Sequence, residues 1–318
     1  MVGKGGVGKT TVSAALALLL ARRGLRTLAV EMDAAGRLPA LLGVPSEVGY
    51  RPAEVGPKLH VLAVDGRTAL EEYLGLIIPV KRLLSTIFSS KVYQYFVAAA
   101  PGLKELMTIG KIWYEATRRE GKRPAWDAIV VDAPATGHSL QYLRMPQAAR
   151  DSFGAGLVRN EATKVTDLLR DPRTTAVHLV TLAEEMPVTE TLETHAQLVG
   201  QLALPAGYVV VNRMHRRHVD AAAIERLRVA AAGAPAAERE LLACVAERAA
   251  EESGWADINA ANLARLRAGI GTLPVVELPF LFVEEFGRRE VEELSQLLEA
   301  GMASRRAAPA RRPGAGTP

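Results

Sequence analysis

The feature that most constrains the fold is a glycine-rich stretch at the start of the chain, which opens MVGKGGVGKTT. Residues 3–10 fit the pattern G-x-x-x-x-G-K-[ST], in which glycines let consecutive backbone N–H groups turn toward a phosphate. The Ala- and Leu-rich stretch from Thr11 to Arg22 is typical of a helix, and Gly24 is typical of its C-terminal end. A loop that leads directly into a helix therefore predicts a nucleotide-binding site.

Strand-like segments alternate with helical ones along the rest of the chain. Most are nearly continuous runs of β-branched residues and Leu, as expected for strands buried on both faces of a parallel sheet. We expect a doubly wound α/β fold with a mostly parallel sheet, whose chemical groups gather at the C-terminal ends of the strands. The predicted strands are Arg26 to Asp33, Leu59 to Asp65, Trp126 to Pro134, Ala176 to Glu184, Gly207 to Arg213 and Leu273 to Pro279.

Two segments depart from this alternation. Residues 69–120 read as consecutive helices and predict a helical insertion, and residues 220–269 are rich in Ala, Glu and Arg and also read as helical. No internal repeat is present. We therefore expect one domain over residues 1–300, with the insertion inside it and a tail from 301 to 318.

Composition narrows the class of protein. The pI is 9.2, but the arginines of the tail alone account for the formal net charge of +4, so a disordered basic tail is the simplest explanation and specific nucleic-acid binding is not expected. No apolar run of about 18 residues and no signal peptide occurs, which favours a cytoplasmic protein with at most transient membrane association. Cys244 is the single cysteine, which excludes an intrachain disulfide.

The strand that normally precedes such a loop has almost no sequence to form it, because only Met1 and Val2 stand before Gly3. We hypothesise that the true start lies upstream and that the strand is truncated in this sequence. Otherwise, a central position of the sheet is expected to be empty.

Several motifs, taken in order, carry a resemblance to a known family. Lys4 directly follows the first glycine, Asp33 stands in VEMDAAGRL, and Asp132 opens DAPATGHSLQYLRMP. The later segments VTLAEEMPVTET, VVVNRM and LPFLFVEEFGRREVEEL add to the similarity. With these residues the sequence resembles the ArsA family of P-loop ATPases with a deviant Walker A motif, which includes arsenite-pump ATPases and the ATPase that targets tail-anchored membrane proteins in eukaryotes.

The resemblance implies a role for each matching position, with ATP and Mg²⁺ as cofactors. Lys9 neutralises the transferring phosphoryl group, Thr10 ligates Mg²⁺, and Asp132 supports the magnesium shell. Lys4 reaches the nucleotide of the partner in a homodimer, and Asp33 orients the attacking water. The other implied groups are the nucleotide contacts Gly3, Gly5, Gly6, Val7, Gly8, Thr11, Asn212, Pro279 and Phe280, and the switch residues Thr136, Gly137 and His138.

Simpler interpretations of some of these residues remain open. Asp33 and Asp132 are also suited to be helix N-caps. The family has Pro and His shortly after the position of Asp33, whereas Ala34, Ala35, Gly36 and Arg37 follow here, which puts the rate of hydrolysis in question. The pair His215 and His218 suggests a metal site, although a solvated loop is the commoner explanation for HRRH. The thiol clusters that hold metalloid or zinc in some members are absent.

The sequence of the insertion predicts the kind of molecule that the protein binds. Its aromatic residues either pack against the sheet or line an apolar groove for a hydrophobic helix, and the resemblance favours a groove that includes Ile87, Phe88 and Met107. We expect a nucleotide-gated homodimeric ATPase that binds a hydrophobic, membrane-protein-like client. The alternatives are the motor subunit of an efflux pump, a ParA/MinD-like positioning ATPase, and a binding switch with negligible hydrolysis.

Overall fold

The computed structural model describes residues 1–33, 36–44, 49–77 and 102–306, together with residues 88, 90, 91, 93 and 95. Ile87, the residues Ala34 and Ala35 after Asp33, and residues 307–318 of the predicted tail lie outside this part. The strands are β1 Thr27–Met32, β2 Ala53–Gly56, β3 Leu59–Val64, β4 Arg119–Glu120, β5 Arg123–Pro124, β6 Ala128–Asp132, β7 Val177–Leu182, β8 Ala206–Met214 and β9 Val275–Pro279.

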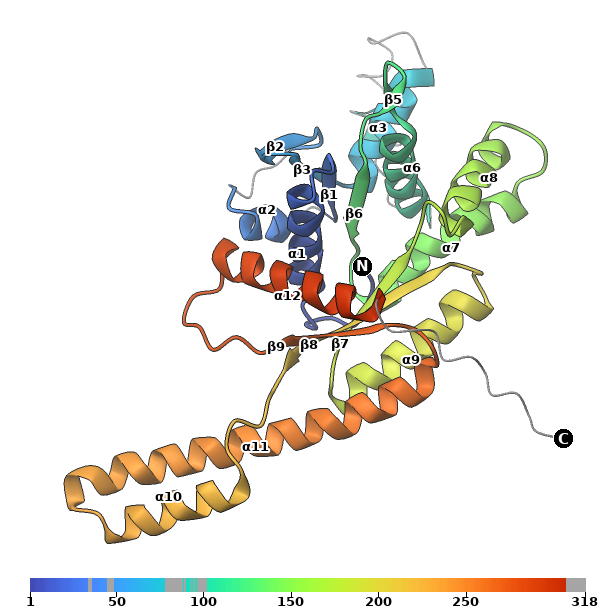
Figure 1. Ribbon diagram of the computed structural model, residues 1–318. Helices are drawn as coiled ribbons and strands as arrows, with labels where there is room; N and C mark the ends of the chain where they lie inside the picture. The colour runs from blue at the N-terminus through green and yellow to red at the C-terminus, as the bar shows by residue number, and fades with distance from the viewer. Residues whose placement is uncertain are drawn as a thin grey trace, which may run out of the picture.

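The helices cover both faces of the sheet and confirm the predicted alternation (Figure 1). They are α1 Lys9–Arg22, α2 Arg37–Leu41, α3 Gly66–Ile77, α6 Leu103–Thr117, α7 Thr136–Ser152, α8 Leu157–Arg170, α9 Glu185–Gly200, α10 Ala221–Gly233, α11 Ala236–Ile270 and α12 Arg288–Arg306. The tail does not begin at 301 as expected, because α12 continues to Arg306 and Met302 packs against the core.

All six predicted strands are present, and they pair with one another in parallel, as β1 with β3 and β6, and as β8 with β7 and β9. The order β2-β3-β1-β6 forms one sheet and β7-β8-β9 a second. The strand β2 was not predicted from the sequence; it is short, partly exposed and antiparallel to β3. The β-branched runs of β1 and β3 are almost fully buried, as a strand covered on both faces requires.

Met1 and Val2 join the two sheets. The backbone N–H of Val2 donates to the carbonyl of His178, and the N–H of Val180 donates to the carbonyl of Val2, at 2.9 and 2.8 Å. On the other side, the N–H of Ala133 donates to the carbonyl of Met1 at 3.3 Å. These two residues therefore lie between β6 and β7, at the central position that is expected to be empty if the strand is missing.

The hydrophobic core lies in two layers. On one face of the sheet, α1 is buried along nearly its whole length and packs with α12 against residues such as Val61, Val130 and Val210. On the other face, α9 and α11 pack against Leu179, Val209 and Val211. This burial places the N-terminus of α1, and the glycine-rich loop before it, at the C-terminal edge of the strands.

Helices α10 and α11 form an antiparallel hairpin that projects from the body of the protein (Figure 1). This confirms the prediction of helix for residues 220–269. Ile224, Ala231 and Ala246 are buried between the two helices, whereas Val229 and Leu241 are exposed on the outside. Within the described residues, no helix has the length and apolar character needed to cross a membrane.

Candidate nucleotide-binding site

The glycine-rich loop has a backbone that other residues would disturb. Gly6 and Gly8 adopt positive φ angles of 84° and 90°. A Cβ atom on Gly3 would lie 2.1 Å from the carbonyl oxygen of Val180, and one on Gly8 would lie 2.2 Å from the side-chain nitrogen of Asn212. The loop thus packs closely against Val180 of β7 and Asn212 of β8, which explains why glycine is needed at these positions.

The loop leads into a helix N-terminus that is open to an anion. Gly8 is the N-cap residue of α1, no side chain caps the helix, and no acidic residue occupies its first turn. The first N–H groups of a helix lack partners inside the helix and carry partial positive charge. Phosphate oxygens would complete these hydrogen bonds, as the sequence predicts for residues 9–11.

Lys9 lies inside the loop. Its side chain is buried, and its ammonium donates a hydrogen bond to the carbonyl of Lys4 at 2.9 Å. Burial lowers the pKa of Lys9, and the nearby Asp132 carboxylate opposes this shift. The ammonium is therefore a desolvated cation enclosed by the glycine-rich loop.

Asp132 ends β6 and is buried beside α1. Its carboxylate accepts a hydrogen bond from the hydroxyl of Ser13 at 3.0 Å. Burial raises the pKa of Asp132, and hydrogen bonds from Thr10 and Ser13 oppose the shift. The alternative that Asp132 is a helix N-cap is wrong, because Ala135 caps α7. A carboxylate and the Thr10 hydroxyl are oxygen ligands of the type Mg²⁺ prefers, so this pair fits a magnesium site.

Asp33 follows β1 in a left-handed conformation, with φ of 66°. The hydroxyl of Tyr142, on α7, donates to its carboxylate at 2.6 Å. Burial and the Asp33 charge both raise the pKa of Tyr142, so this tyrosine stays protonated as the donor. The N-cap alternative is wrong here also, because Gly36 is the N-cap residue of α2.

The sequence did not indicate the residue that anchors the N-terminus of α2. Glu31 is 2% exposed within β1, and its carboxylate accepts hydrogen bonds from the backbone N–H groups of Gly36, Arg37 and Leu38 at 2.9 to 3.1 Å. A carboxylate in an otherwise apolar strand was a signal that could have identified it. Glu31 thus anchors the start of α2 next to the candidate site.

Lys4 points to a partner within its own chain. Its ammonium lies 2.7 Å from the carboxylate of Glu190 on α9, and both side chains are about one third exposed, at 32% and 33%. No local pattern in the sequence indicated Glu190.

The predicted switch residues form the first turn of α7. Thr136 begins the helix, its hydroxyl oxygen is buried, and the described residues offer it no hydrogen-bond partner. Gly137 and His138 are exposed in the same turn. A Cβ on Gly5 would lie 3.9 Å from Ala135, so this turn is next to the glycine-rich loop. The unpaired hydroxyl fits a site that a phosphate or its water shell would complete.

The predicted adenine side lies at the ends of β8 and β9. Asn212 is 3% exposed, and its side-chain amide donates to the carbonyl of Val7 at 3.0 Å, so its N–H is used to hold the loop. Pro279 ends β9, and Phe280 donates its N–H to the carbonyl of Met214 at 3.0 Å. The three residues therefore lie at one edge, on the opposite side of the loop from Asp132.

The sequence context of His215 suggested a solvated loop, but in the structure its ring packs against other aromatic rings. Its ring stacks between those of Trp255 and Phe280, and its Nδ1 lies 2.8 Å from the Glu252 carboxylate. His218 is exposed. Over the described part of the chain, no group of three or more His, Cys, Asp or Glu side chains is arranged to hold a metal, so the histidine pair has no support as a metal site.

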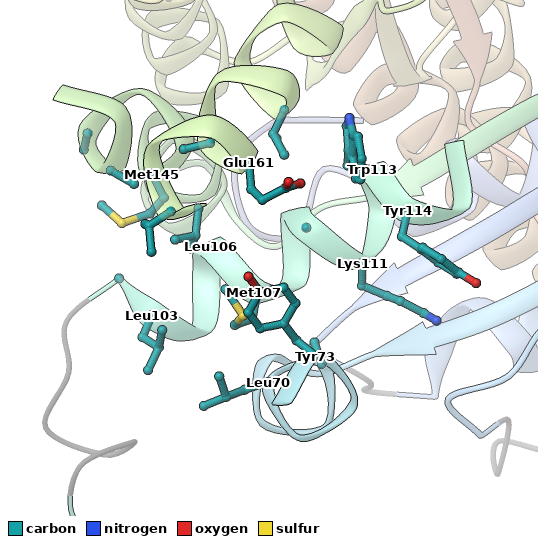
Figure 2. Close-up of a pocket in the computed structure, with 18 of the residues that line it drawn as sticks. Leu70, Tyr73, Leu103, Leu106, Met107, Lys111, Trp113, Tyr114, Met145 and Glu161 are labelled. Atoms are coloured by element: carbon teal, nitrogen blue, oxygen red, sulfur yellow. The ribbon is translucent and has the colours of Figure 1, made fainter. Parts of the chain in front are cut away.

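A second feature is an apolar cavity of about 670 Å³ between α3, α6, α7 and α8. Met107 lies in its wall, together with Leu103 and Leu106 of α6 (Figure 2). Tyr73 points toward Met107 from α3. Phe88 packs with Tyr93 next to this wall, at a ring distance of 5.2 Å.

Comparison with known proteins shows which ATPases this chain is similar to. Residues 1–157 match the model of a family described as anion-transporting ATPase. ATPase BagA of Mycobacterium tuberculosis is 37% identical over 225 residues, which cover 69% of this chain and 66% of that protein. Arsenical pump-driving ATPases of Acidiphilium multivorum and Escherichia coli are each 28% identical over 233 residues, or 66% of this chain and 38% of theirs. The chain thus spans just under two thirds of the length of BagA and much less of the pump ATPases.

Proposed function

Because this chain belongs to the ArsA family of anion-transporting ATPases, we propose that it hydrolyses ATP with Mg²⁺ as a homodimer and binds a hydrophobic client. The observation that carries the proposal is the arrangement of the buried Lys9 and Asp132 beside the uncapped start of α1. Opposite charges and free N–H groups at one helix N-terminus are the groups that phosphoryl transfer requires.

Different residues of the chain would have different roles in hydrolysis. The loop amides and Lys9 hold the phosphates and stabilise the charge that develops during transfer. Thr10 and Asp132 would hold Mg²⁺, which neutralises phosphate charge when it is bound. Asp33, positioned by Tyr142, would orient the water that attacks the γ-phosphorus.

Support for the proposed homodimer comes from the surroundings of Lys4. In one subunit its ammonium is paired with Glu190 at the surface, and the pair is only partly buried. An exposed ion pair of this kind contributes about 0–1 kcal/mol, so it is easily exchanged for a stronger partner. The triphosphate of a second subunit would be such a partner, and ATP would then hold the two subunits together.

A hydrophobic client is supported by the apolar cavity. Its volume of about 670 Å³ lies within the range of about 300–1,000 Å³ typical of ligand pockets. Phe153 and Tyr114, which also line it, are 53% and 45% exposed, so apolar surface continues to the outside. Large exposed apolar surface next to a cavity is typical of a binding site.

The ATPase proposal is tested by steady-state turnover of the full chain with Mg-ATP. Lys9→Ala removes the buried cation, and we expect kcat to fall on the order of 100-fold or more. Lys58→Ala, on the turn before β3, is the matched control and should leave turnover unchanged. Absence of turnover in the wild-type protein, or equal turnover in Lys9→Ala, would contradict the enzymatic assignment.

The client proposal is tested with a fluorescent transmembrane-type peptide and a fluorescent acyl probe, each added to the full chain with Mg-ATP. Met107→Glu and Leu103→Glu place charges in the cavity wall. They should abolish binding of whichever of the two probes enters the cavity, and they should leave ATP turnover unchanged. Val229→Glu adds the same charge on the exposed face of α10 and should bind normally. Binding that survives both cavity variants would contradict a client site there.

A further inference from the structure

A second pocket, which is polar, lies at the opposite edge of the sheet from the glycine-rich loop. Its volume is about 410 Å³, and residues just before β1, before β2 and before β6, at the start of β3, and on α3 and α6 line it. The first residues of β1, β3 and β6 are paired with one another, so the pocket lies at the N-terminal edge of these strands. We call it the edge pocket; its lining includes Arg51, His60, Lys111, Glu115, Arg118 and Trp126.

The floor of the edge pocket is a buried cluster of charges. Lys111 and Glu115, on α6, are buried, and their charged groups lie 3.3 Å apart. The Glu115 carboxylate also accepts a hydrogen bond from Nε1 of Trp126 at 3.0 Å and lies 3.3 Å from Nε of Arg118. Lys111 is paired in addition with Glu72, at 3.0 Å. Both carboxylates of the lining are therefore already bonded to groups of the chain, which disfavours a cation as the ligand.

The lining carries more cations than carboxylates. Its cations are Arg26, Arg51, Lys111 and Arg118. Arg26 is paired with Glu120, which is outside the lining, at 2.5 Å. Arg51 is exposed, and within the described residues it has neither a hydrogen-bond nor an ion-pair partner. One positive charge of the edge pocket is thus left without an opposite charge.

Two buried nitrogen atoms of the lining have unused hydrogen-bonding capacity. Nδ1 of His60 has no hydrogen-bond partner in the described part of the chain, and Nε of Arg118 has only the ion pair with Glu115, without hydrogen-bond alignment. Both side chains lie against the indole of Trp126, the His60 ring at 4.9 Å and the Arg118 guanidinium at 5.3 Å. Buried polar atoms without a partner are rare in folded proteins, and a ligand is one of the groups that can supply the missing bond.

These groups fit an oxyanion that is part of a small organic molecule. The planar guanidinium of arginine matches the two oxygens of a carboxylate or phosphate, and Arg51 and Arg118 both offer one. The volume of about 410 Å³ lies within the range of about 300–1,000 Å³ typical of ligand sites, which leaves room for more than an inorganic ion. The rings of Tyr50 and Tyr114, which flank the Lys111 ammonium at 4.8 and 5.0 Å, add apolar surface for the rest of the molecule.

We propose that the edge pocket binds a small organic anion through its carboxylate or phosphate group, with Arg51, His60 and Arg118 as the binding residues. The site shares no residue with the glycine-rich loop and does not depend on the proposed function. The carboxylate and the phosphate are two sources of the same oxyanion chemistry, and the experiment separates them.

The test is calorimetry on the full chain with citrate and with glucose 6-phosphate. At least one of them should bind saturably. Glucose, which lacks the charge, and inorganic sulfate, which lacks the organic part, should bind more weakly. Arg51→Gln removes the unpaired cation and should weaken binding about tenfold, because a hydrogen bond between charged groups is lost. Arg123→Gln removes the same charge from an exposed position of β5, outside the lining, and should bind as the wild type does.

The results that would overturn the inference are specific. It is wrong if neither anion binds, if sulfate binds as tightly as the organic anions, or if Arg51→Gln keeps the affinity of the wild type. Lys9→Ala separates the two sites: anion binding that is lost in Lys9→Ala but kept in Arg51→Gln would belong to the glycine-rich loop. None of these results bears on ATP turnover, so the proposed function stands or falls separately.

A second measurement needs no variant and so does not depend on the folding of one. Phenylglyoxal modifies accessible arginines, and mass spectrometry reports the rate at each position. In the wild type, the anion that binds should slow modification of Arg51 several-fold and leave that of Arg123 unchanged. Equal modification of Arg51 with and without the anion would contradict the inference.

Discussion

The ammonium of Lys4 lies 2.7 Å from the carboxylate of Glu190, within a single subunit. The same lysine is the residue for which the sequence predicts a role across a dimer interface. One cation cannot pair fully with both partners, so the ion pair and the predicted dimer compete for it. This competition makes Glu190 a residue through which dimerisation can be tested.

Glu190→Gln should strengthen ATP-dependent dimerisation, because it removes the internal partner of Lys4. The pair is about one third exposed and contributes about 0–1 kcal/mol in each of the two subunits, so the dimer dissociation constant should fall by up to about thirtyfold. Analytical ultracentrifugation with Mg-ATP measures this change. Glu193→Gln removes the same charge from an exposed position of α9 and serves as the control; weaker dimerisation of Glu190→Gln would contradict the prediction.

Gly8→Ala should destabilise the protein far more than Gly6→Ala, although both glycines have positive φ angles. A Cβ on Gly6 meets nothing within 4 Å, so we expect a loss of about 1 kcal/mol from backbone strain alone. A Cβ on Gly8 would collide with the buried Asn212 amide, and a loss of about 3 kcal/mol follows. Urea unfolding measures both values.

The double variant Gly8→Ala/Asn212→Ala tests the cause of this difference. If the collision with Asn212 is responsible, the second substitution should restore part of the lost stability, and the two effects will not add. Additive losses would mean that the strain lies elsewhere in the loop.

Tyr142→Phe should lower kcat about tenfold without changing KM for Mg-ATP. The ring is kept and only the hydrogen bond to Asp33 is lost, and a bond to a charged group contributes about 1.5–3 kcal/mol. Asp33 would then be free to leave the position in which it orients water. Tyr114→Phe, at an exposed ring of α6, is the control, and an unchanged or higher kcat in Tyr142→Phe would show that the bond does not support catalysis.

The sequence predicted those parts of the fold that depend on local pattern. The helix after the glycine-rich loop, the apolar runs of the six strands and the helices of residues 220–269 are each specified by neighbouring residues, and all are confirmed. The bonds that position the site join distant residues: Tyr142 with Asp33, Lys4 with Glu190, and Glu31 with the turn that starts α2. No periodicity or spacing in the sequence reports such contacts, because they depend on how the elements pack.

His215 illustrates the same limit. Its neighbours Arg216, Arg217 and His218 predict a solvated loop, and they are indeed exposed. The rings that cover His215 come from α11 and from the segment after β9, which only the fold brings together. The residue types were visible in the sequence, but their juxtaposition was not.

His178 should make the protein less stable in acid. It is half-buried in β7, and its Nδ1 accepts a hydrogen bond from the backbone N–H of Tyr208 at 2.9 Å, which requires the neutral ring. Burial lowers the pKa of His178 from 6.5 to about 4. Above pH 6.5 the ring is neutral in both the folded and the unfolded state, and no penalty exists. As the pH falls from 6.5 to 4, the unfolded chain takes up the proton first, so unfolding is favoured by up to about 3 kcal/mol.

The measurement is the free energy of unfolding in urea at pH 7.5 and pH 4.5, for the wild type and for His178→Gln, whose side-chain oxygen can still accept from Tyr208. The difference between the two proteins removes the contribution of other titrating groups, such as Asp132, whose raised pKa acts in the opposite direction. We expect the wild type to lose about 2–3 kcal/mol more than the variant between these pH values. His218→Gln, at an exposed histidine, should follow the wild type, and equal pH dependence of wild type and His178→Gln would mean that the His178 ring does not resist protonation.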